Sequence, residues 1–188
     1  MTRKAKYICI EGTEGCYKTT NSRALANALE LEGFKVLLTK EPGTAHIPMT
    51  NELRKFMLDG QYDGILTVQA RELISQAIRS IHMTHLIDPA LDTYDYIIQD
   101  RGILSGLAYG EACGNAFEDV AYLSEFVLVG TKFEDMSMLE IYDTIIFLKG
   151  DTEKGLQLAQ AAKQEFAAGD SIEAKGLEFM LAVEDNFD

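Results

Sequence analysis

A short apolar run, Tyr7–Ile10, leads into the loop Gly12–Thr20, and apolar residues at helical spacing follow directly. Against the phosphate-loop pattern G-x-x-x-x-G-K-[ST], this loop matches the first glycine, the lysine and the threonine, whereas Tyr17 stands at the second glycine. A loop between a strand and a helix directs backbone N–H groups and the positive helix end toward phosphate oxygens. The sequence therefore predicts a nucleotide phosphate site on an α/β scaffold.

Two side chains of the loop have predicted roles. Lys18 is expected to hold the β- and γ-phosphates of ATP, and Thr19 to ligate Mg²⁺. Tyr17 is the departure, because a Cβ is unfavourable where the loop needs positive φ or a close approach to phosphate. If the backbone accepts Tyr17, its phenol can flank the nucleotide; otherwise the affinity for triphosphate should be weak. The alternative is an ordinary glycine turn with an incidental lysine. The loop residues expected to contact ATP are Gly12, Thr13, Gly15, Cys16, Tyr17, Lys18, Thr19 and Thr20.

Strand and helix patterns alternate along the rest of the chain. Further strands are predicted at Phe34–Thr39, Tyr94–Asp100 and Asp143–Leu148. Helices are predicted from Lys18 to Gly33, then at Asn51–Leu58, Thr67–Leu86, Ile103–Gly110 and Phe117–Val129, from Asp151 or Thr152 to Glu165, and at Ile172–Phe187. We expect a single domain, residues 1–188, with a parallel sheet covered by helices on both faces.

The long predicted helix, Thr67–Leu86, carries an apolar stripe at helical spacing. Such a stripe is expected to pack against a second copy of the chain or, equally, to face the core. Pro89 is expected to help end the helix. The stripe consists of Leu73, Ile74, Ala77, Ile78 and Ile81.

An acid and an arginine follow the third apolar strand. Asp100 is placed to ligate Mg²⁺, directly or through water, or to hold a substrate hydroxyl, and Arg101 can reach a transferring phosphoryl group. An acid that ends a strand is also a common turn former. Together with the phosphate loop, the functional interpretation is favoured.

The charge distribution limits the classes of partner. A net charge of −13 argues against long nucleic acid, and no arginine follows Arg101. Three scattered cysteines favour a reducing compartment over a disulfide framework or a zinc cluster. The sequence contains neither a signal-peptide pattern nor an apolar run long enough to cross a membrane. We therefore predict a soluble, cytoplasmic protein without a membrane partner.

Several motifs occur in a fixed order along the chain. They are Glu11–Gly15 with Lys18-Thr19-Thr20, Thr39–Thr44, Arg79 with His82, Asp100-Arg101 with Ser105 and Ala108-Tyr109, and Asp170–Glu173. Over about residues 7–187 this set resembles the thymidylate kinases, the dTMP-phosphorylating branch of the P-loop nucleoside-monophosphate kinases. The resemblance implies a three-layer P-loop kinase sandwich with a short lid at about residues 163–171. It also implies a homodimer and Mg²⁺-dependent transfer of the γ-phosphoryl group of ATP to the 5′-phosphate of a deoxynucleotide.

The resemblance assigns acceptor-site roles by motif position. Glu14 would contact the acceptor near its sugar or phosphate, Arg54 would hold the acceptor phosphate, and Arg101 would clamp it near the transferring group. Arg79 would read the base, and Tyr109 would pack under the sugar and disfavour a 2′-hydroxyl. In the alternative without function, Arg54 and Arg79 are ordinary exposed charges on helices, and Tyr109 only packs against its neighbours. The residues expected around the acceptor are Glu14, Lys40, Arg54, Ser75, Arg79, Asp100, Arg101, Ser105, Gly106 and Tyr109.

This chain departs from the family at the acceptor pocket. Ser75 stands where the family has a base-stacking phenylalanine, and Lys40 stands where it usually has arginine. Gly102, Gly106 and Gly110 replace larger side chains, which predicts a roomier pocket suited to a larger or modified base.

The lid departs as well. The family places a catalytic arginine in the phosphate loop or in the lid, and this chain has one in neither. Lys163 is the nearby cation expected to substitute, so the predicted catalytic residues are Lys18, Arg101, Glu14 and Lys163. Because lysine lacks the planar fork of arginine, slow turnover is expected unless Lys163 or a partner subunit compensates. The chain also ends about where the family adds a fifth strand and a terminal helix.

The leading hypothesis is a Mg²⁺-dependent kinase that phosphorylates dTMP or a 5-substituted dUMP. A second hypothesis keeps the scaffold and changes the acceptor to a purine or another modified deoxynucleotide. A third, motivated by Tyr17 and the arginine-free lid, is a non-catalytic nucleotide-binding or regulatory protein.

Overall fold

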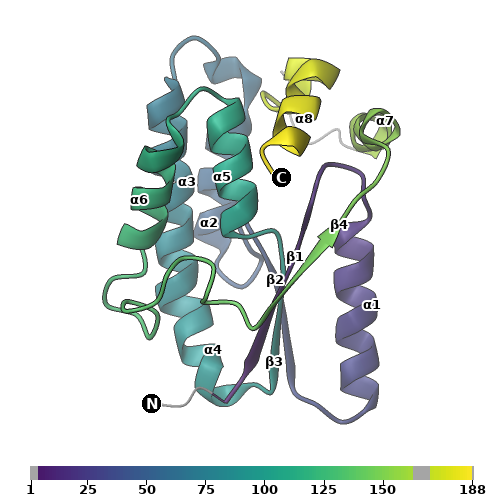
Figure 1. The fold of residues 1–188 in the computed structure, drawn as a ribbon, viewed down its shortest axis with the longest axis vertical. Helices are drawn as coiled ribbons and strands as arrows, with labels where there is room; N and C mark the ends of the chain where they lie inside the picture. Colours follow the sequence, from purple (N-terminus) through teal and green to yellow (C-terminus); the bar gives the residue numbers. More distant parts are fainter. Residues whose placement is uncertain (1–3, 163–169, 188) are drawn as a thin grey trace.

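The computed structural model describes residues 4–162 and 170–187, and shows a parallel sheet between layers of helices (Figure 1). Lys163 and most of the predicted lid lie outside the described residues. The strands are β1 Lys6–Gly12, β2 Val36–Lys40, β3 Tyr96–Asp100 and β4 Thr144–Leu148. The α-helices are α1 Lys18–Leu31, α2 Pro48–Leu58, α3 Val68–His82, α4 Asp88–Thr93, α5 Ile103–Ala112, α6 Phe117–Phe126, α7 Thr152–Ala162 and α8 Gly176–Asp185. Every predicted strand is present among them.

The sheet brings the ends of three strands together. Its order is β2-β3-β1-β4 and all pairs are parallel. In the register, Asp100 of β3 lies between Ile10 of β1 and Lys40 of β2. Because parallel strands end at the same edge, the loops that follow β1, β2 and β3 meet there.

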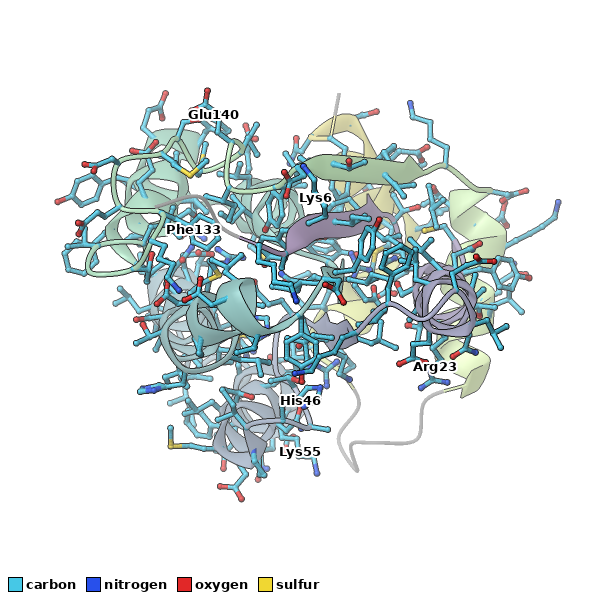
Figure 2. All side chains as sticks on the ribbon, turned by 90° about the horizontal axis from the view of Figure 1, so that it is seen from below. Lys6, Arg23, His46, Lys55, Phe133 and Glu140 are labelled. Atoms are coloured by element: carbon cyan, nitrogen blue, oxygen red, sulfur yellow. The ribbon has the colours of Figure 1, made fainter. Side chains whose placement is uncertain are left out.

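Helices cover both faces of the sheet. On one face, α1 packs Ala26 against Ile10 and Ile98. The other face is covered by a larger cluster that includes Tyr7, Ile97 and Phe133 and draws on α4, α5 and α6. Figure 2 shows Phe133 lying inside this layer, while charged side chains such as Arg23, Lys55 and Glu140 lie at the rim. The predicted α/β sandwich is thus observed.

Helix α3 turns a mainly polar face toward the protein interior. Ile78 is buried as expected, but Leu73 is 57% exposed and Ala77 is also exposed. The buried residues of α3 are Glu72, Gln76, Ile78, Arg79 and His82. Four of these five are polar and form hydrogen bonds within the protein, so the buried face of α3 is mainly polar, and Ile78 is the stripe residue that is fully buried.

Two predicted helix boundaries also differ. Pro89 does not end the long helix, because a π-helical turn at Met83–Ile87 shifts the hydrogen-bond pattern and α4 follows it. The missing N–H of Pro89 then falls in the first turn of α4, where it is tolerated. The predicted terminal helix is a 3₁₀ turn, Glu173–Lys175, followed by α8, with the break at Gly176 in a positive-φ conformation.

Within the described part of the chain, the helices are all too short or too polar to cross a membrane.

Candidate active site

The phosphate loop joins β1 to α1 through tight backbone contacts. Gly12 and Gly15 have positive φ, and a Cβ at Gly12 would lie 2.3 Å from the carbonyl oxygen of Leu148. A Cβ at Gly15 would lie 2.2 Å from the Cα of Gly155 in α7. Only glycine fits these two positions, so the loop is held against the end of β4 and the first turn of α7, with its amide groups at the start of α1.

Tyr17 adopts the positive-φ backbone conformation that is unfavourable for a residue with a Cβ. Its φ is 61° and its ψ is 27°, in the left-handed region, and it precedes the first residue of α1. The side chain is 64% exposed. The backbone therefore accepts a tyrosine at the second glycine position by directing the side chain out of the loop.

Lys18 points back into the loop. Its Nζ donates a hydrogen bond to the carbonyl oxygen of Thr13 and lies 3.5 Å from Sγ of Cys16. Burial, together with the neighbouring charge of Arg101, lowers the pKa of Lys18. An anion in this loop would stabilise the ammonium form that burial disfavours, which is the behaviour expected of a phosphate-binding lysine.

Thr19 and Asp100 meet although they are far apart in the sequence. Oγ1 of Thr19 donates a 2.5 Å hydrogen bond to Oδ2 of Asp100, so the first turn of α1 touches the end of β3. These are hard oxygen donors, the type that Mg²⁺ prefers. The described residues contain no cluster of three or more His, Cys, Asp or Glu side chains suited to a metal. The donor set fits a Mg²⁺ ion held mainly by substrate phosphates and water.

Arg101 is aimed at the phosphate loop by its backbone and by its partners. Its φ is 65°, and Nη1 donates to the carbonyl oxygen of Gly12 at 3.0 Å and to Oγ of Ser105 at 3.1 Å. Nη2 donates to the hydroxyl of Tyr109 at 3.2 Å and forms an ion pair with Glu14 at 3.2 Å. The predicted groups Glu14, Arg101, Ser105 and Tyr109 therefore form one contact set.

Glu11 supports this set from beneath, a role that the sequence analysis did not identify. Its buried carboxylate accepts hydrogen bonds from the backbone N–H of Gly102 at 2.8 Å and of Ser105 at 3.1 Å. It thereby satisfies N–H groups at the start of α5. Burial raises the pKa of Glu11 despite these hydrogen bonds. These hydrogen bonds hold in place the backbone that follows Arg101.

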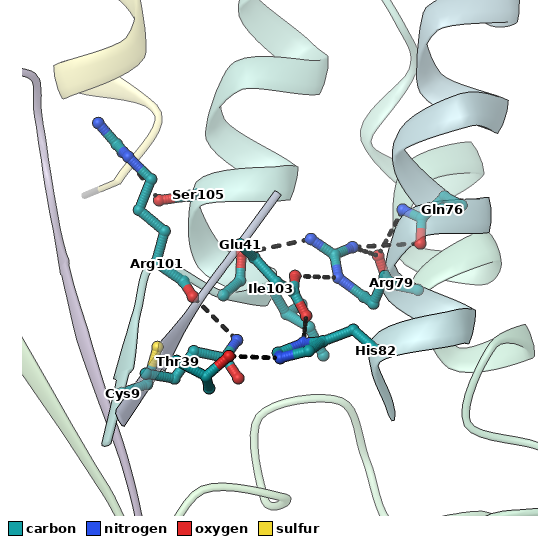
Figure 3. Close-up of polar contacts among 12 residues, drawn as sticks. Cys9, Thr39, Glu41, Gln76, Arg79, His82, Arg101, Ile103 and Ser105 are labelled. Carbon is teal, nitrogen blue, oxygen red and sulfur yellow. Dashed lines mark hydrogen bonds and ion pairs between the residues drawn. The ribbon is translucent and has the colours of Figure 1, made fainter. Parts of the chain in front are cut away.

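A second polar network lies between β2 and α3 (Figure 3). Glu41 forms an ion pair with Nε of Arg79 at 2.9 Å and accepts a hydrogen bond from Nδ1 of His82 at 2.9 Å. The other ring nitrogen of His82 lies 2.9 Å from Oγ1 of Thr39. Both ring nitrogens of His82 therefore make hydrogen bonds within the protein.

Arg79 is buried rather than an exposed helix charge. Besides Glu41, it donates to Gln76 at 3.1 Å, to Ser124 at 3.2 Å and to the carbonyl oxygen of Gly102 at 3.3 Å. Four of its five N–H donors therefore have protein acceptors, which leaves one for a ligand. The side chain of Arg101 extends away from this network (Figure 3). The base-reading role of Arg79 stays a prediction.

The three glycines expected to enlarge the pocket have close neighbours instead. A Cβ at Gly102 would lie 2.3 Å from the hydroxyl of Tyr142, and one at Gly106 would lie 2.5 Å from Nη2 of Arg79. A Cβ at Gly110 would lie 3.0 Å from Val120 and 3.1 Å from Oε2 of Glu72. The chain's own side chains occupy this space, so the prediction that these glycines widen the pocket was wrong.

A single cavity of about 930 Å³ adjoins both networks. One end is formed by the phosphate-loop and β3 residues, and the other by α3, the end of α5 and the segment that leads into α8. Every predicted acceptor-site residue lines it: Glu14, Lys40, Arg54, Ser75, Arg79, Asp100, Arg101, Ser105, Gly106 and Tyr109. The structure brings these side chains together, whereas Lys163 lies outside the described residues.

The cavity also contains residues that sequence reasoning missed. Arg71 donates to the carbonyl oxygen of Met57 and to Oγ of Ser171 at 2.9 Å, and forms an ion pair with Asp63 at 2.7 Å. It thereby ties α3 to the segment that enters α8. Glu72 lies beside it and is nearly buried. The polar spacing of Glu72, Gln76, Arg79 and His82 along α3 was the signal that could have identified this face.

Comparison with known proteins gives a consistent result. The family model for thymidylate kinase matches residues 10–180. A thymidylate kinase from Halothermothrix orenii is 33% identical over 174 residues, which cover 92% of this chain and 77% of that protein. One from Bradyrhizobium sp. strain BTAi1 is 31% identical over 184 residues, which cover 98% of this chain and 76% of that protein.

Among solved structures, the thymidylate kinase from Ehrlichia chaffeensis is similar, with a TM-score of 0.69 and 25% sequence identity. The match covers 97% of this chain and 84% of that one. The predicted P-loop kinase fold and the predicted resemblance are both confirmed. The phosphate loop, the strand-end acid and the matched family together show that the chain belongs to the thymidylate kinase family, as a divergent member, and is a nucleoside-monophosphate kinase.

Proposed function

We propose that this protein transfers the γ-phosphoryl group of ATP to dTMP or a 5-substituted dUMP in a Mg²⁺-dependent reaction. The observation that carries the proposal is the contact between Thr19 and Asp100 at one end of the cavity, beside Lys18 and Arg101. Oxygen donors for Mg²⁺ and two cationic side chains are thereby assembled where three parallel strands end. When bound, Mg²⁺ would neutralise charge on the phosphates.

The residues of this chain divide the work of binding and positioning. Lys18 and the loop amides would bind the donor phosphates, while Thr19 and Asp100 would hold the metal. Arg101 would stabilise charge that develops on the transferring group. Its contact with Glu14 keeps the guanidinium in place before substrate arrives.

Along the rest of the cavity, Arg54 and Lys40 supply positive charge for the acceptor phosphate. Tyr109 flanks Arg101, with the guanidinium carbon 5.1 Å from the ring centre, which suits packing under a sugar. Lys163 is expected to replace the missing lid arginine, with slow turnover as the consequence. An unchanged kcat in Lys163→Ala would remove it from the mechanism.

The test is a direct assay with ATP, Mg²⁺ and each deoxynucleoside monophosphate in turn, with the diphosphate product measured. Formation of dTDP or a 5-substituted dUDP, abolished by EDTA and by Lys18→Ala, is expected. Nucleotide binding without any diphosphate product would overturn the proposal.

We also propose that two copies associate. Leu73 on α3 is 57% exposed, and Tyr122 and Phe126 on α6 are 67% and 61% exposed, so the layer made by these helices presents apolar side chains to solvent. Light scattering should give twice the mass of one chain, and the mass of one chain would refute association. The cysteines Cys9, Cys16 and Cys113 are free thiols, which is compatible with the predicted cytoplasmic location.

A further inference from the structure

Glu72 presents a carboxylate oxygen to the cavity. The residue is 9% exposed and lies on the wall that α3 contributes. Its Oε1 accepts a 2.8 Å hydrogen bond from Nε2 of Gln76. For Oε2, none of the residues that the structure describes supplies a donor, although the atom lies where a Cβ at Gly110 would be 3.1 Å away. Because Gly110 has no side chain, Oε2 can occupy this position without a close contact.

The surroundings of Glu72 suit part of a ligand rather than a protein side chain. Ser75 follows one turn later on the cavity wall, where the thymidylate kinase resemblance expects an aromatic ring. Burial raises the pKa of Glu72, while the hydrogen bond from Gln76 and the charge of Arg79 oppose that rise. A ligand N–H group that bonds to Oε2 would stabilise the ionised form that burial disfavours.

The orientation of Glu72 is set by a chain of hydrogen bonds. Arg79 can only donate, so the amide oxygen of Gln76 must accept from it, as the 3.1 Å contact shows. The amide nitrogen of Gln76 must then donate, and it contacts both Glu72 and Ser124. Oε1 of Glu72 must therefore accept the hydrogen bond from Gln76. The second oxygen, Oε2, remains available to a ligand in the cavity.

We propose that Glu72 selects the acceptor by its base, with Oε2 accepting a hydrogen bond from an N–H group, imide or amino, on the edge of that base. This inference rests on the proposed function and specifies its acceptor subsite. Arg79 has only one N–H donor left for a ligand. The carboxylate of Glu72 therefore shares with Arg79 the task of distinguishing one acceptor base from another.

Glu72→Gln is a sharp test because the hydrogen-bond chain forces its orientation. The new amide oxygen must accept from Gln76, so the new NH₂ group replaces Oε2 and an acceptor becomes a donor. Equilibrium binding is measured by calorimetry for dTMP and 5-methyl-dCMP, which carry opposite donor and acceptor patterns on one base edge. The pair dGMP and dAMP serves as a purine counterpart. Glu111→Gln, on an exposed residue of α5 outside the cavity lining, is the matched control.

We expect Glu72→Gln to change the ratio of dissociation constants within at least one of these pairs by tenfold or more, with ATP affinity unchanged. Glu72→Asp, which keeps the carboxylate but withdraws it by one methylene, should weaken the preferred ligand and serves if the glutamine variant does not fold. Ratios within twofold of wild type in the folded variant would overturn the inference. If the ratios stay within twofold while the wild-type protein still forms diphosphate, only the role of Glu72 is refuted and the proposed function stands. A changed ratio without phosphoryl transfer would refute only the proposed function, and absence of nucleotide binding would refute both.

Discussion

Glu41→Gln would show how much one buried ion pair contributes to the stability of this chain. Glu41 is 6% exposed, and Arg79 and His82 each contact its carboxylate at 2.9 Å. Burial alone would raise the pKa of Glu41, but the charge of Arg79 and the hydrogen bond from His82 bring it down from 4.5 to about 2. A shift of this size corresponds to about 3 kcal/mol in favour of the folded state with an ionised carboxylate.

The substitution would also leave the guanidinium of Arg79 buried without its carboxylate. Breaking a buried ion pair from one side typically costs about 3–5 kcal/mol. We therefore expect Glu41→Gln to lower the free energy of unfolding by about that amount near neutral pH. Urea unfolding followed by circular dichroism measures it. Glu52→Gln, on an exposed residue of α2, is the control and should change stability by less than about 0.5 kcal/mol.

The pH dependence separates the charge from the shape of the side chain. Because the pKa of Glu41 is lower in the folded state than in the unfolded chain, its contribution is complete above about pH 4.5 and is lost as the pH falls toward 2. The stability difference between wild type and Glu41→Gln should shrink by about 1 kcal/mol between about pH 6 and about pH 3.5. A difference that stays constant over this range would refute the reasoning.

Three further substitutions test the loop and the acceptor wall. Tyr17→Gly removes a Cβ from a residue with φ of 61° and should stabilise the protein by up to about 1 kcal/mol; a lower Tm in scanning calorimetry would contradict the assignment of strain. Arg101→Lys keeps the charge but loses the fork that joins Gly12 to Tyr109, so kcat/KM should fall by about a hundredfold or more with little change in Tm, and wild-type kinetics would exclude a role in transfer. Gly106→Ala places a Cβ 2.5 Å from Nη2 of Arg79 and should cost about 1–3 kcal/mol in urea unfolding, although alanine is the better helix former; a stabilised variant would show that the guanidinium moves freely.

Local patterns predicted the scaffold well because they depend on neighbours in the chain. Each apolar run that was expected to be a strand is one, and α1 begins at Lys18 directly after the phosphate loop. The contact between Thr19 and Asp100 was also foreseeable, since parallel strands end at one edge of a sheet. The helix ends near Pro89 could not be predicted in the same way, because a π-helical turn leaves no periodic pattern of apolar residues in the sequence.

The orientation of α3 could not be read from the sequence. A count of apolar residues selects the face that carries Leu73, yet the inward face carries Glu72 and Arg79. Buried polar residues are stable only when partners from other elements satisfy them, and Ser124 on α6 and Glu41 after β2 supply that satisfaction here.

The sequence by itself determined that this chain is an α/β protein with a phosphate loop and an acid at the end of a buried strand, because hydrophobic period and loop chemistry are local properties. Only the tertiary structure decided what occupies the space beside Gly106 and Gly110. The positions freed by the missing side chains are taken by Arg79 and by Glu72, which approach from another helix. Whether a gap stays open depends on packing between distant segments, and that packing places the Glu72 carboxylate on the cavity wall where the sequence predicted a larger pocket.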